Sequence, residues 1–412
     1  MMKYIFTFLF AAILIFGFSQ NSGCNDSNAI NFNPQAQQND GSCTYDPLVL
    51  DPSIIIDELP SIVEETSGLI FFNGGLWTHN DSGGQASIYK LDSKTGAILQ
   101  TIGITNGNNY DIEDITQDDE FIYIGDHGNN RGTRKDLTIY KIKKSDIPET
   151  SNADIEAEII KFSYNDQKSF ERKNRNNDYD CESLASFGDH LYIFTKNWVN
   201  QETKCYKIPK TPGEYKLDIH DAFNARGLVT SADYNKEKGI LLLMGYENFV
   251  PFIWLIWDFK DDHFFSGHKR RVDFAYISGA QTEGVCFIDN ENIMFSCEDS
   301  YYPPRIYQIN AEQIKSADKS KEKYQPFSIK LEPDSKKQTL NIYIDGLKKS
   351  KFDVEVYNLR WQKVSQYSFI EDNHSQTVNV SIPIADLGEG IFFVRIEEGK
   401  NIGFQKLILK NN

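Results

Sequence analysis

Ile88-Tyr89-Lys90-Leu91 is the first copy of a phrase that returns four more times along the chain, and this repetition decides the fold. The later copies are Ile139-Tyr140-Lys141-Ile142, Cys205-Tyr206-Lys207-Ile208, Ile253-Trp254-Leu255-Ile256 and Ile306-Tyr307-Gln308-Ile309. An aromatic residue flanked by apolar positions suits a strand buried on both faces. The copies start 51, 66, 48 and 53 residues apart, which is the spacing of propeller blades or a related repeat array.

Each phrase is preceded by a second strand pattern, at 76–79, 121–125, 191–195, 240–244 and 293–296. Outer strands follow most phrases, at 98–104, 158–164 and 271–277. Each repeat therefore predicts a four-stranded antiparallel sheet, and residues 51–315 predict a closed all-β propeller with five blades. The fifth repeat lacks an outer strand, which residues 53–59 could supply. Six blades remain an alternative if 145–178 contains a divergent unit.

The two ends of the chain differ from this repeat region. Residues 1–19 contain one lysine and then an uncharged apolar run, which predicts a secretory signal peptide. No other apolar run is long enough to span a membrane. Residues 316–323 are almost entirely polar and predict a linker. Alternating apolar residues in 324–412 predict a small C-terminal β-sandwich.

Six cysteines in an exported chain allow fifteen complete pairings. Cys24 and Cys43 stand alone in a polar module, residues 20–50, where a disulfide would be the main staple. Four further cysteines lie within the repeats, where they could be buried free thiols.

The net charge is −16, and residues 324–412 contribute +1 of it. An acidic body argues against nucleic-acid partners, which need a basic surface. It is compatible with cations or with polyhydroxylated ligands, and also with solubility alone.

Ionisable residues recur where the strands of successive blades would converge around a central channel. At the start of the first strand they are Glu113, Glu182, Arg226 and Glu283, and at the end of the second strand Asp81, Asp126, Lys196, Glu247 and Glu298. Such charges are costly unless they are paired, solvated or bound to an ion.

Two uses of these charges are expected. Carboxylates suit Ca²⁺, so the candidate metal ligands are Glu113, Glu182, Glu283 and Asp126. The candidate ligand-binding residues are Asp81, Asp126, Glu182, Lys196, Arg226 and Glu298. The alternative is a ring in which Arg226 and Lys196 merely neutralise the glutamates.

Two Gly- and Asn-rich loops, 77–84 and 125–131, each contain a histidine. His79 or His127 could act as an acid or base, and Glu113 is the third catalytic candidate. The alternative is a pair of β-turns closed by their own Asp side chains.

Short motifs in the repeats resemble the esterase-like, phytase-like propellers of bacteria. The motifs are Glu113-Asp114-Ile115, Glu283-Gly284-Val285 and Asp126-His127-Gly128-Asn129-Asn130. This resemblance implies the propeller fold and leaves the activity open. The chain has no Gly-x-Ser-x-Gly elbow, zincin motif or Walker A loop.

The C-terminal region resembles the type A sorting domain of the type IX secretion system of Bacteroidetes. The resemblance rests on residues 354–359, 362–364, 384–396 and the ending 405–411. Pro333-Asp334-Ser335 and Arg360-Trp361 depart from the usual pattern. Residues 23–45 resemble a cysteine-bracketed module of secreted Bacteroidetes proteins. These resemblances imply that the secretion machinery is a partner and that the protein is released or displayed at the outer-membrane surface.

The sequence thus predicts an exported propeller that binds an unknown small-molecule or glycan ligand at an acidic channel mouth where Ca²⁺ could sit. A Ca²⁺-dependent phosphate or ester hydrolase and a non-catalytic interaction scaffold are the alternatives.

Overall fold

The protein is described by a computed structural model that covers residues 21–316, 327–348, 351–370, 377–399 and 401–410. The predicted signal peptide, 1–19, and nearly all of the predicted linker lie outside these residues. The described chain is nearly all β, with one short helix, α1 (Ala311–Lys315), and four 3₁₀ turns.

Five sheets form the body of the molecule, and we number them in chain order of their first strands. Sheet 1 contains β5 (Thr66–Phe72), β6 (Gly75–Asn80), β7 (Gln85–Leu91), β8 (Ile98–Asn108) and β12 (Asn152–Ile155). Sheet 2 contains β9 (Ile112–Gln117), β10 (Phe121–Asp126), β11 (Leu137–Lys143), β13 (Glu158–Tyr164) and β17 (Gly213–Leu217). Sheet 3 contains β14 (Cys181–Phe187), β15 (His190–Thr195), β16 (Glu202–Pro209) and β18 (Ile219–Asn224).

The remaining two sheets recruit strands from the N-terminal side of the chain. Sheet 4 contains β19 (Leu228–Asn235), β20 (Ile240–Glu247), β21 (Val250–Trp257), β22 (His268–Asp273) and β3 (Leu48–Val49). Sheet 5 contains β23 (Thr282–Phe287), β24 (Asn292–Cys297), β25 (Arg305–Asn310) and β4 (Ser53–Ile56).

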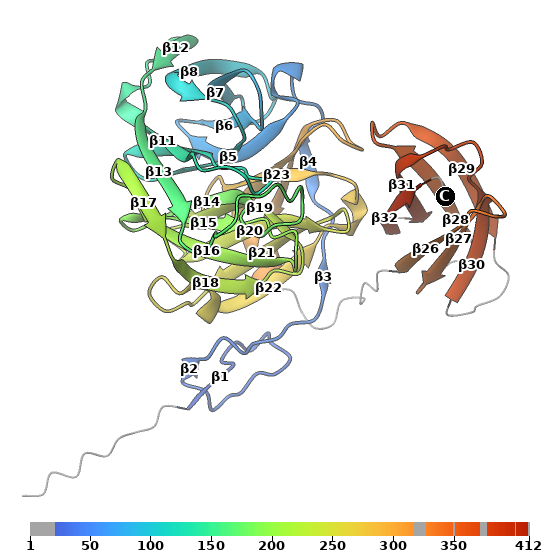
Figure 1. Cartoon of the computed structure of the whole chain (residues 1–412). Helices are drawn as coiled ribbons and strands as arrows, with labels where there is room; N and C mark the ends of the chain where they lie inside the picture. The colour runs from blue at the N-terminus through green and yellow to red at the C-terminus, as the bar shows by residue number, and fades with distance from the viewer. Residues whose placement is uncertain (1–20, 317–326, 349–350, 371–376, 400, 411–412) are drawn as a thin grey trace, which may run out of the picture.

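The five sheets are arranged around one axis (Figure 1). Their first strands contact one another in a closed cycle, β5–β9–β14–β19–β23–β5. The repeated aromatic phrases lie in the third strands, where their apolar side chains pack between neighbouring sheets; Tyr206 and Tyr307 are both fully buried. The fold is therefore all-β and propeller-like.

The first and last parts of this ring meet in sheet 5. Ile56 pairs with Ile306, so β4 supplies the outer strand that the fifth repeat lacks. Burying both edges in this way removes an open ladder that could pair with other chains. Segment 145–178 contains β12 and β13, which belong to sheets 1 and 2.

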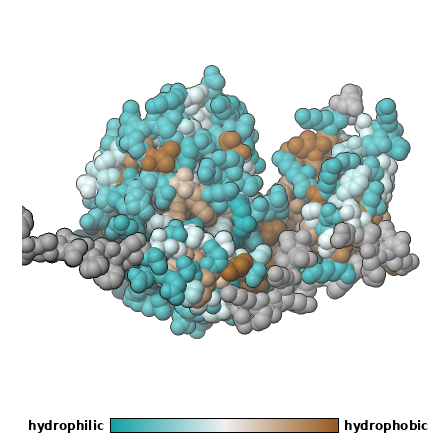
Figure 2. All heavy atoms as spheres, turned by 90° about the horizontal axis from the view of Figure 1, so that it is seen from below, coloured by the Kyte–Doolittle hydropathy of each residue, from teal (hydrophilic) through white to brown (hydrophobic). Residues whose placement is uncertain are grey.

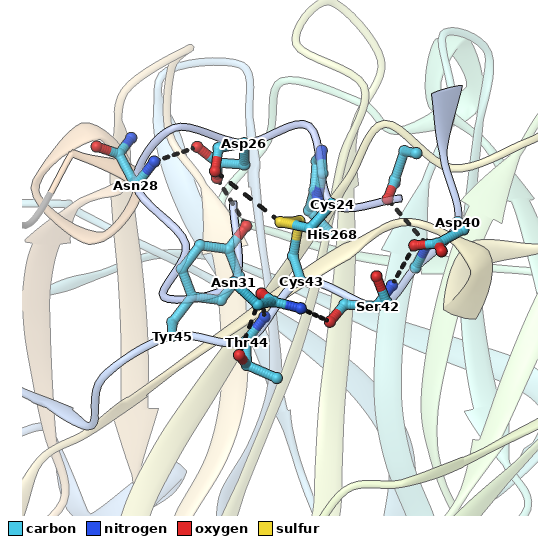
Figure 3. Close-up of a disulfide and its surroundings, with 12 residues drawn as sticks. Cys24, Asp26, Asn28, Asn31, Asp40, Ser42, Cys43, Thr44, Tyr45 and His268 are labelled. Atoms are coloured by element: carbon cyan, nitrogen blue, oxygen red, sulfur yellow. Dashed lines mark hydrogen bonds between the residues drawn. A yellow bond between two sulfur atoms is a disulfide. The ribbon is translucent and has the colours of Figure 1, made fainter. Parts of the chain in front are cut away.

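The N-terminal module sits against sheet 4 and is held by the predicted Cys24–Cys43 disulfide. Its two short strands, β1 (Ser22–Gly23) and β2 (Gln38–Asn39), pair in parallel. Asp26 accepts hydrogen bonds from Asn28 N and the Tyr45 hydroxyl, and Asp40 accepts one from Ser42 N (Figure 3). These carboxylates therefore close local turns in the manner typical of aspartate.

The C-terminal residues form two sheets that share one hydrophobic core. The first contains β26 (Ser328–Asp334), β27 (Thr339–Asp345) and β30 (Thr377–Pro383), and the second contains β28 (Lys351–Asn358), β29 (Lys363–Ile370), β31 (Gly390–Glu398) and β32 (Asn401–Leu409). Trp361, Phe393 and Phe404 of this region pack against Phe249 and Tyr301 of the ring. Figure 2 shows hydrophobic atoms on both lobes near this boundary.

Candidate functional site: an acidic cup at the ring axis

The glutamates at the ring axis are positioned by β-bulges. In sheet 2, Ile112 pairs with Asp126 and Asp114 pairs with Gly125, so Glu113 is the extra residue of the bulge. Glu182 and Glu283 occupy the same position in sheets 3 and 5. A bulge adds one residue to one strand and re-aims its side chain, which is how three glutamates are presented at equivalent places.

Seven carboxyl groups gather at this end of the axis, and we call the group the acidic cup. Its members are Asp81, Asp111, Glu113, Asp180, Glu182, Glu283 and Glu298. Ligand oxygens of Asp81, Asp111 and Glu113 lie within 4.8 Å of one another, as do those of Glu113, Asp180 and Glu182. Glu113 is therefore shared by two three-carboxyl groups.

Lys196, which follows β15, is the cation of the cup. Its Nζ lies 2.9 Å from Glu182 Oε2 and 3.9 Å from Glu283 Oε1. Among the residues that the structure describes, no other lysine or arginine forms a salt bridge with a cup carboxyl. One buried cation therefore faces a large excess of acidic groups.

The partners of the remaining oxygens are unevenly distributed. Asp180 accepts hydrogen bonds from Trp198 Nε1 and Asn129 N, both at 2.6 Å. By contrast, Glu283 Oε2 and Asp81 Oδ1 are buried atoms without a hydrogen-bond partner. Buried polar atoms in folded proteins almost always have hydrogen-bond partners, so these two oxygens are available to a bound cation.

Burial raises the pKa of every cup carboxyl, and repulsion by the neighbouring carboxyls adds to the effect. The pKa of Asp81, Glu182 and Glu283 rises to about 7, and that of Asp111 to about 6. The pKa of Glu113, Asp180 and Glu298 is raised well above its ordinary value. Several protons are therefore held in the cup near neutral pH, and a bound cation would displace them.

The floor of the cup is closed by Asp114, the residue after Glu113. Its carboxylate accepts hydrogen bonds from Leu184 N of sheet 3 at 2.8 Å and from Ala232 N of sheet 4 at 3.1 Å. Ser231 Oγ donates to Asp114 at 3.0 Å and accepts from Val285 N of sheet 5 at 3.1 Å. Four sheets are thus tied together directly beneath the glutamates.

The wall of the cup is formed in part by Gly128. A Cβ at this position would lie 2.1 Å from Glu113 Oε1 and 2.5 Å from Asp111 Oδ2. Only glycine lets the backbone approach the two carboxyls this closely.

Asp126, expected as a metal ligand, is instead paired outside the two three-carboxyl groups. Its Oδ1 lies 2.9 Å from Arg134 Nη1 and also accepts a hydrogen bond from Asp111 N. Its charge is therefore compensated without an ion.

Arg226 does not lie at the axis either. The bulge of sheet 4 falls between Val229 and Ser231, so Thr230 occupies the position expected for Arg226. Arg226 is exposed four residues earlier and lies over the Trp254 ring at 5.4 Å. At the end of the second strands, the same register places His127 and Tyr246 where Asp126 and Glu247 were expected.

His79 and His127 are fully buried beside the cup. Their Nδ1 atoms lie 3.2 Å and 3.0 Å from the carbonyl oxygens of Asn80 and Cys181. Burial lowers the pKa of His79 to about 4 and that of His127 to about 3, so both rings are neutral at pH 7. Their Nε2 atoms pack against Gly68 and Gly125. This placement suits a structural role for both rings, as packing groups between neighbouring sheets.

Asp111 and Asp180 were not expected in the site, although the sequence contains a signal for them. Each stands two residues before a cup glutamate, in Asp111-Ile112-Glu113 and Asp180-Cys181-Glu182. In an extended chain, residues i and i+2 lie on the same face. The repeated Asp-x-Glu spacing could therefore have identified both.

The donor set fits a hard divalent cation. Ca²⁺ takes six to eight oxygen ligands and tolerates irregular geometry, and the cup offers carboxylate oxygens only. Glu113, Glu182, Asp111, Asp180 and Asp81 are the residues that would hold it, and Glu283, whose Oε2 has no hydrogen-bond partner, could contribute a further oxygen.

Among solved structures, a putative 6-phosphogluconolactonase from Bacteroides uniformis is similar at 10% identity and a TM-score of 0.33, covering 79% of this chain and 89% of that one. A GH43 β-xylosidase/α-arabinofuranosidase from a compost metagenome is similar at 8% identity and a TM-score of 0.36, covering 64% and 94%. These similarities are too distant to assign an activity. No curated protein matches the chain significantly.

Within the described residues, no helix has both the length and the apolar character needed to cross a membrane. The C-terminal sheets have a clear relative: residues 333–410 match the secretion system C-terminal sorting domain family. The protein therefore contains a type IX secretion sorting domain, as the sequence predicted, and this domain indicates export to the cell surface.

Proposed function

We propose that the protein is an exported five-bladed propeller, with one blade in each of the five sheets, that binds a divalent cation in the acidic cup. Ca²⁺ is the preferred ion, and the cation together with Lys196 holds a small-molecule or glycan ligand at the channel mouth. The C-terminal sorting domain delivers this propeller through the type IX machinery.

The observation that carries the proposal is that two three-carboxyl groups share Glu113. Within each group, ligand oxygens of the three residues lie within 4.8 Å of one another. A single lysine cannot offset the repulsion among seven carboxyl groups, of which four belong to buried residues and three to half-buried ones. Protons can relieve that repulsion, as the raised pKa values indicate, but a divalent cation does so while also satisfying the orphaned oxygens.

The cation is tested by thermal melting of the full chain after EDTA treatment and again with excess Ca²⁺. We expect Ca²⁺ to raise the melting temperature and to release protons into a weakly buffered solution at pH 7. Glu113→Gln combined with Glu283→Gln should abolish both effects, whereas Glu149→Gln, at an exposed position, should leave them intact. Equal melting of the unaltered protein with and without EDTA would refute the proposal.

A Ca²⁺-dependent hydrolase of phosphate or ester substrates is the second candidate function. It is favoured by the free oxygen of Glu283, which could orient a water molecule beside a cation-bound substrate. Turnover in a panel of phosphate and ester substrates that is lost in Glu113→Gln and Glu182→Gln would support it. Ca²⁺ binding without turnover would leave the binding function.

The third candidate, an interaction scaffold, requires that the cup carry no ion. Lys196 paired with Glu182 is the observation that favours it. The same EDTA experiment separates the two, because a scaffold held by this ion pair should melt identically with and without Ca²⁺.

A further inference from the structure

A second cluster of metal-binding side chains lies outside the acidic cup, at the edge shared by sheets 3 and 4. It contains His220 of β18 together with Asp262 and His263 of the loop between β21 and β22. We propose that these three residues form a site for a transition-metal ion of the Zn²⁺ class. This site is independent of the proposed function of the cup.

The three side chains already lie close together. One ligand atom from each residue falls within 4.8 Å of the other two. The two imidazole rings are stacked, with centroids 4.9 Å apart and planes at 14°. His220 Nε2 lies 3.5 Å from Asp262 Oδ1.

The separation of 3.5 Å between His220 Nε2 and Asp262 Oδ1 matches the distance between two ligand atoms of a tetrahedral zinc ion. Zn²⁺ binds imidazole nitrogen at about 2.0–2.1 Å and carboxylate oxygen at about 2.0–2.2 Å. At a tetrahedral angle these bonds place the nitrogen and the oxygen about 3.4 Å apart. The spacing of His220 Nε2 and Asp262 Oδ1 is thus close to that of a zinc-bound pair, and the ion would replace the hydrogen bond of 3.1 Å between His220 Nε2 and the Asp262 carbonyl oxygen. The exposed ring of His263, which now stacks on His220, would turn to supply the third bond.

The carboxylate is held in place by residues on its other side. Lys207 Nζ and the Tyr192 hydroxyl donate to Asp262 Oδ2 at 2.6 Å and 2.8 Å. Oδ1 is thereby left for the metal, and outer partners of this kind are what orient a metal-binding carboxylate. Tyr192 also packs edge-on against Phe264, with ring centroids 4.9 Å apart, which anchors the loop next to His263.

The chemistry of this cluster differs from that of the cup. Two imidazoles and one carboxylate favour Zn²⁺, Ni²⁺ or Cu²⁺, whereas an all-oxygen set favours Ca²⁺. His263 is exposed and the other two residues are half-buried, so an ion can enter and water can complete its coordination. A bound ion would join β18 of sheet 3 to the loop of sheet 4.

The test is Zn²⁺ binding to the EDTA-treated full chain, measured by calorimetry in the presence of excess Ca²⁺. We expect one Zn²⁺ per chain and a higher melting temperature on loading. His220→Ala and His263→Ala should each weaken binding at least about tenfold, and the double substitution should remove the thermal shift. His263 makes no side-chain cap to the following 3₁₀ turn, so His263→Ala should fold normally.

Two controls define the site. His190→Ala, in β15 of the same sheet but outside the cluster, should retain full Zn²⁺ affinity. Glu113→Gln with Glu283→Gln should also retain it, because the cup is a separate site. Zn²⁺ affinity unchanged in both histidine variants, or lost in either control, would overturn the assignment.

Discussion

Removing one carboxyl from the acidic cup should stabilise the protein, and Glu283→Gln is the variant in which this is best tested. Glu283 Oε2 is buried without a partner, and Oε1 is 3.9 Å from Lys196, which retains its closer contact with Glu182. Glutamine keeps the size of the side chain and removes its charge. The substitution therefore isolates the cost of ionising this group.

That cost follows from the raised pKa. Burial, opposed by Lys196, brings the pKa of Glu283 to about 7 from the ordinary 4.5. The folded state therefore binds more protons than the unfolded state between these values, and stability falls as the pH rises through about 7. Proton linkage gives a cost of about 3 kcal/mol at pH 8 and about 1 kcal/mol at pH 5.

The assay is urea unfolding of the full chain in EDTA at pH 5 and at pH 8. Glu283→Gln should gain about 2 kcal/mol more at pH 8 than at pH 5, and exposed Glu149→Gln should change little at either pH. A destabilised or pH-independent Glu283→Gln variant would show that the carboxyl is not strained by its neighbours. With Ca²⁺ present, the gain at pH 8 should shrink, because the ion would use the carboxylate.

Three further predictions concern the same architecture. Lys196→Met should destabilise the protein by about 3 kcal/mol at pH 8 and by less at pH 5, where protonated carboxyls need no counter-charge; equal urea midpoints for variant and parent at pH 8 would contradict this. Asp114→Asn should cost about 3 kcal/mol in urea unfolding, because an amide group would face the backbone N–H groups of Leu184 and Ala232, whereas an unchanged midpoint would mean that the floor is not stabilising. Deletion of 324–412 should leave the protein in the periplasm, as followed by cell fractionation, and normal surface display of the truncated chain would refute the sorting role.

Much of the fold was predictable because the strands repeat a strong pattern. The phrase Ile306-Tyr307-Gln308-Ile309 and its relatives became third strands, and the missing outer strand of the fifth repeat was found at β4. Strands of this kind have few alternative registers, since a one-residue slip would turn every side chain to the opposite face and disrupt its packing against the neighbouring sheet.

The site was harder to predict because each β-bulge shifts the register between the first and second strands, so equivalent positions in different sheets cannot be found by counting residues. Each bulge opposes two residues to one, so counting from the strand pattern placed Asp126 and Glu247 where His127 and Tyr246 lie. In sheet 4 the equivalent residue is the uncharged Thr230, whereas the charge pattern of the other repeats indicates Arg226. Local sequence also could not reveal that Arg134 neutralises Asp126.

The pairing of β4 with β25 has a consequence for how this protein matures. In sequence, β4 lies at the start of the propeller region and β25 at its end. The two strands therefore cannot pair until residue 310 has reached the compartment that contains residue 53. Contacts between such distant segments form slowly. The C-terminal sheets pair strands that are much closer in sequence, so they can fold sooner. The sorting domain could therefore be folded while the ring of five sheets is still open.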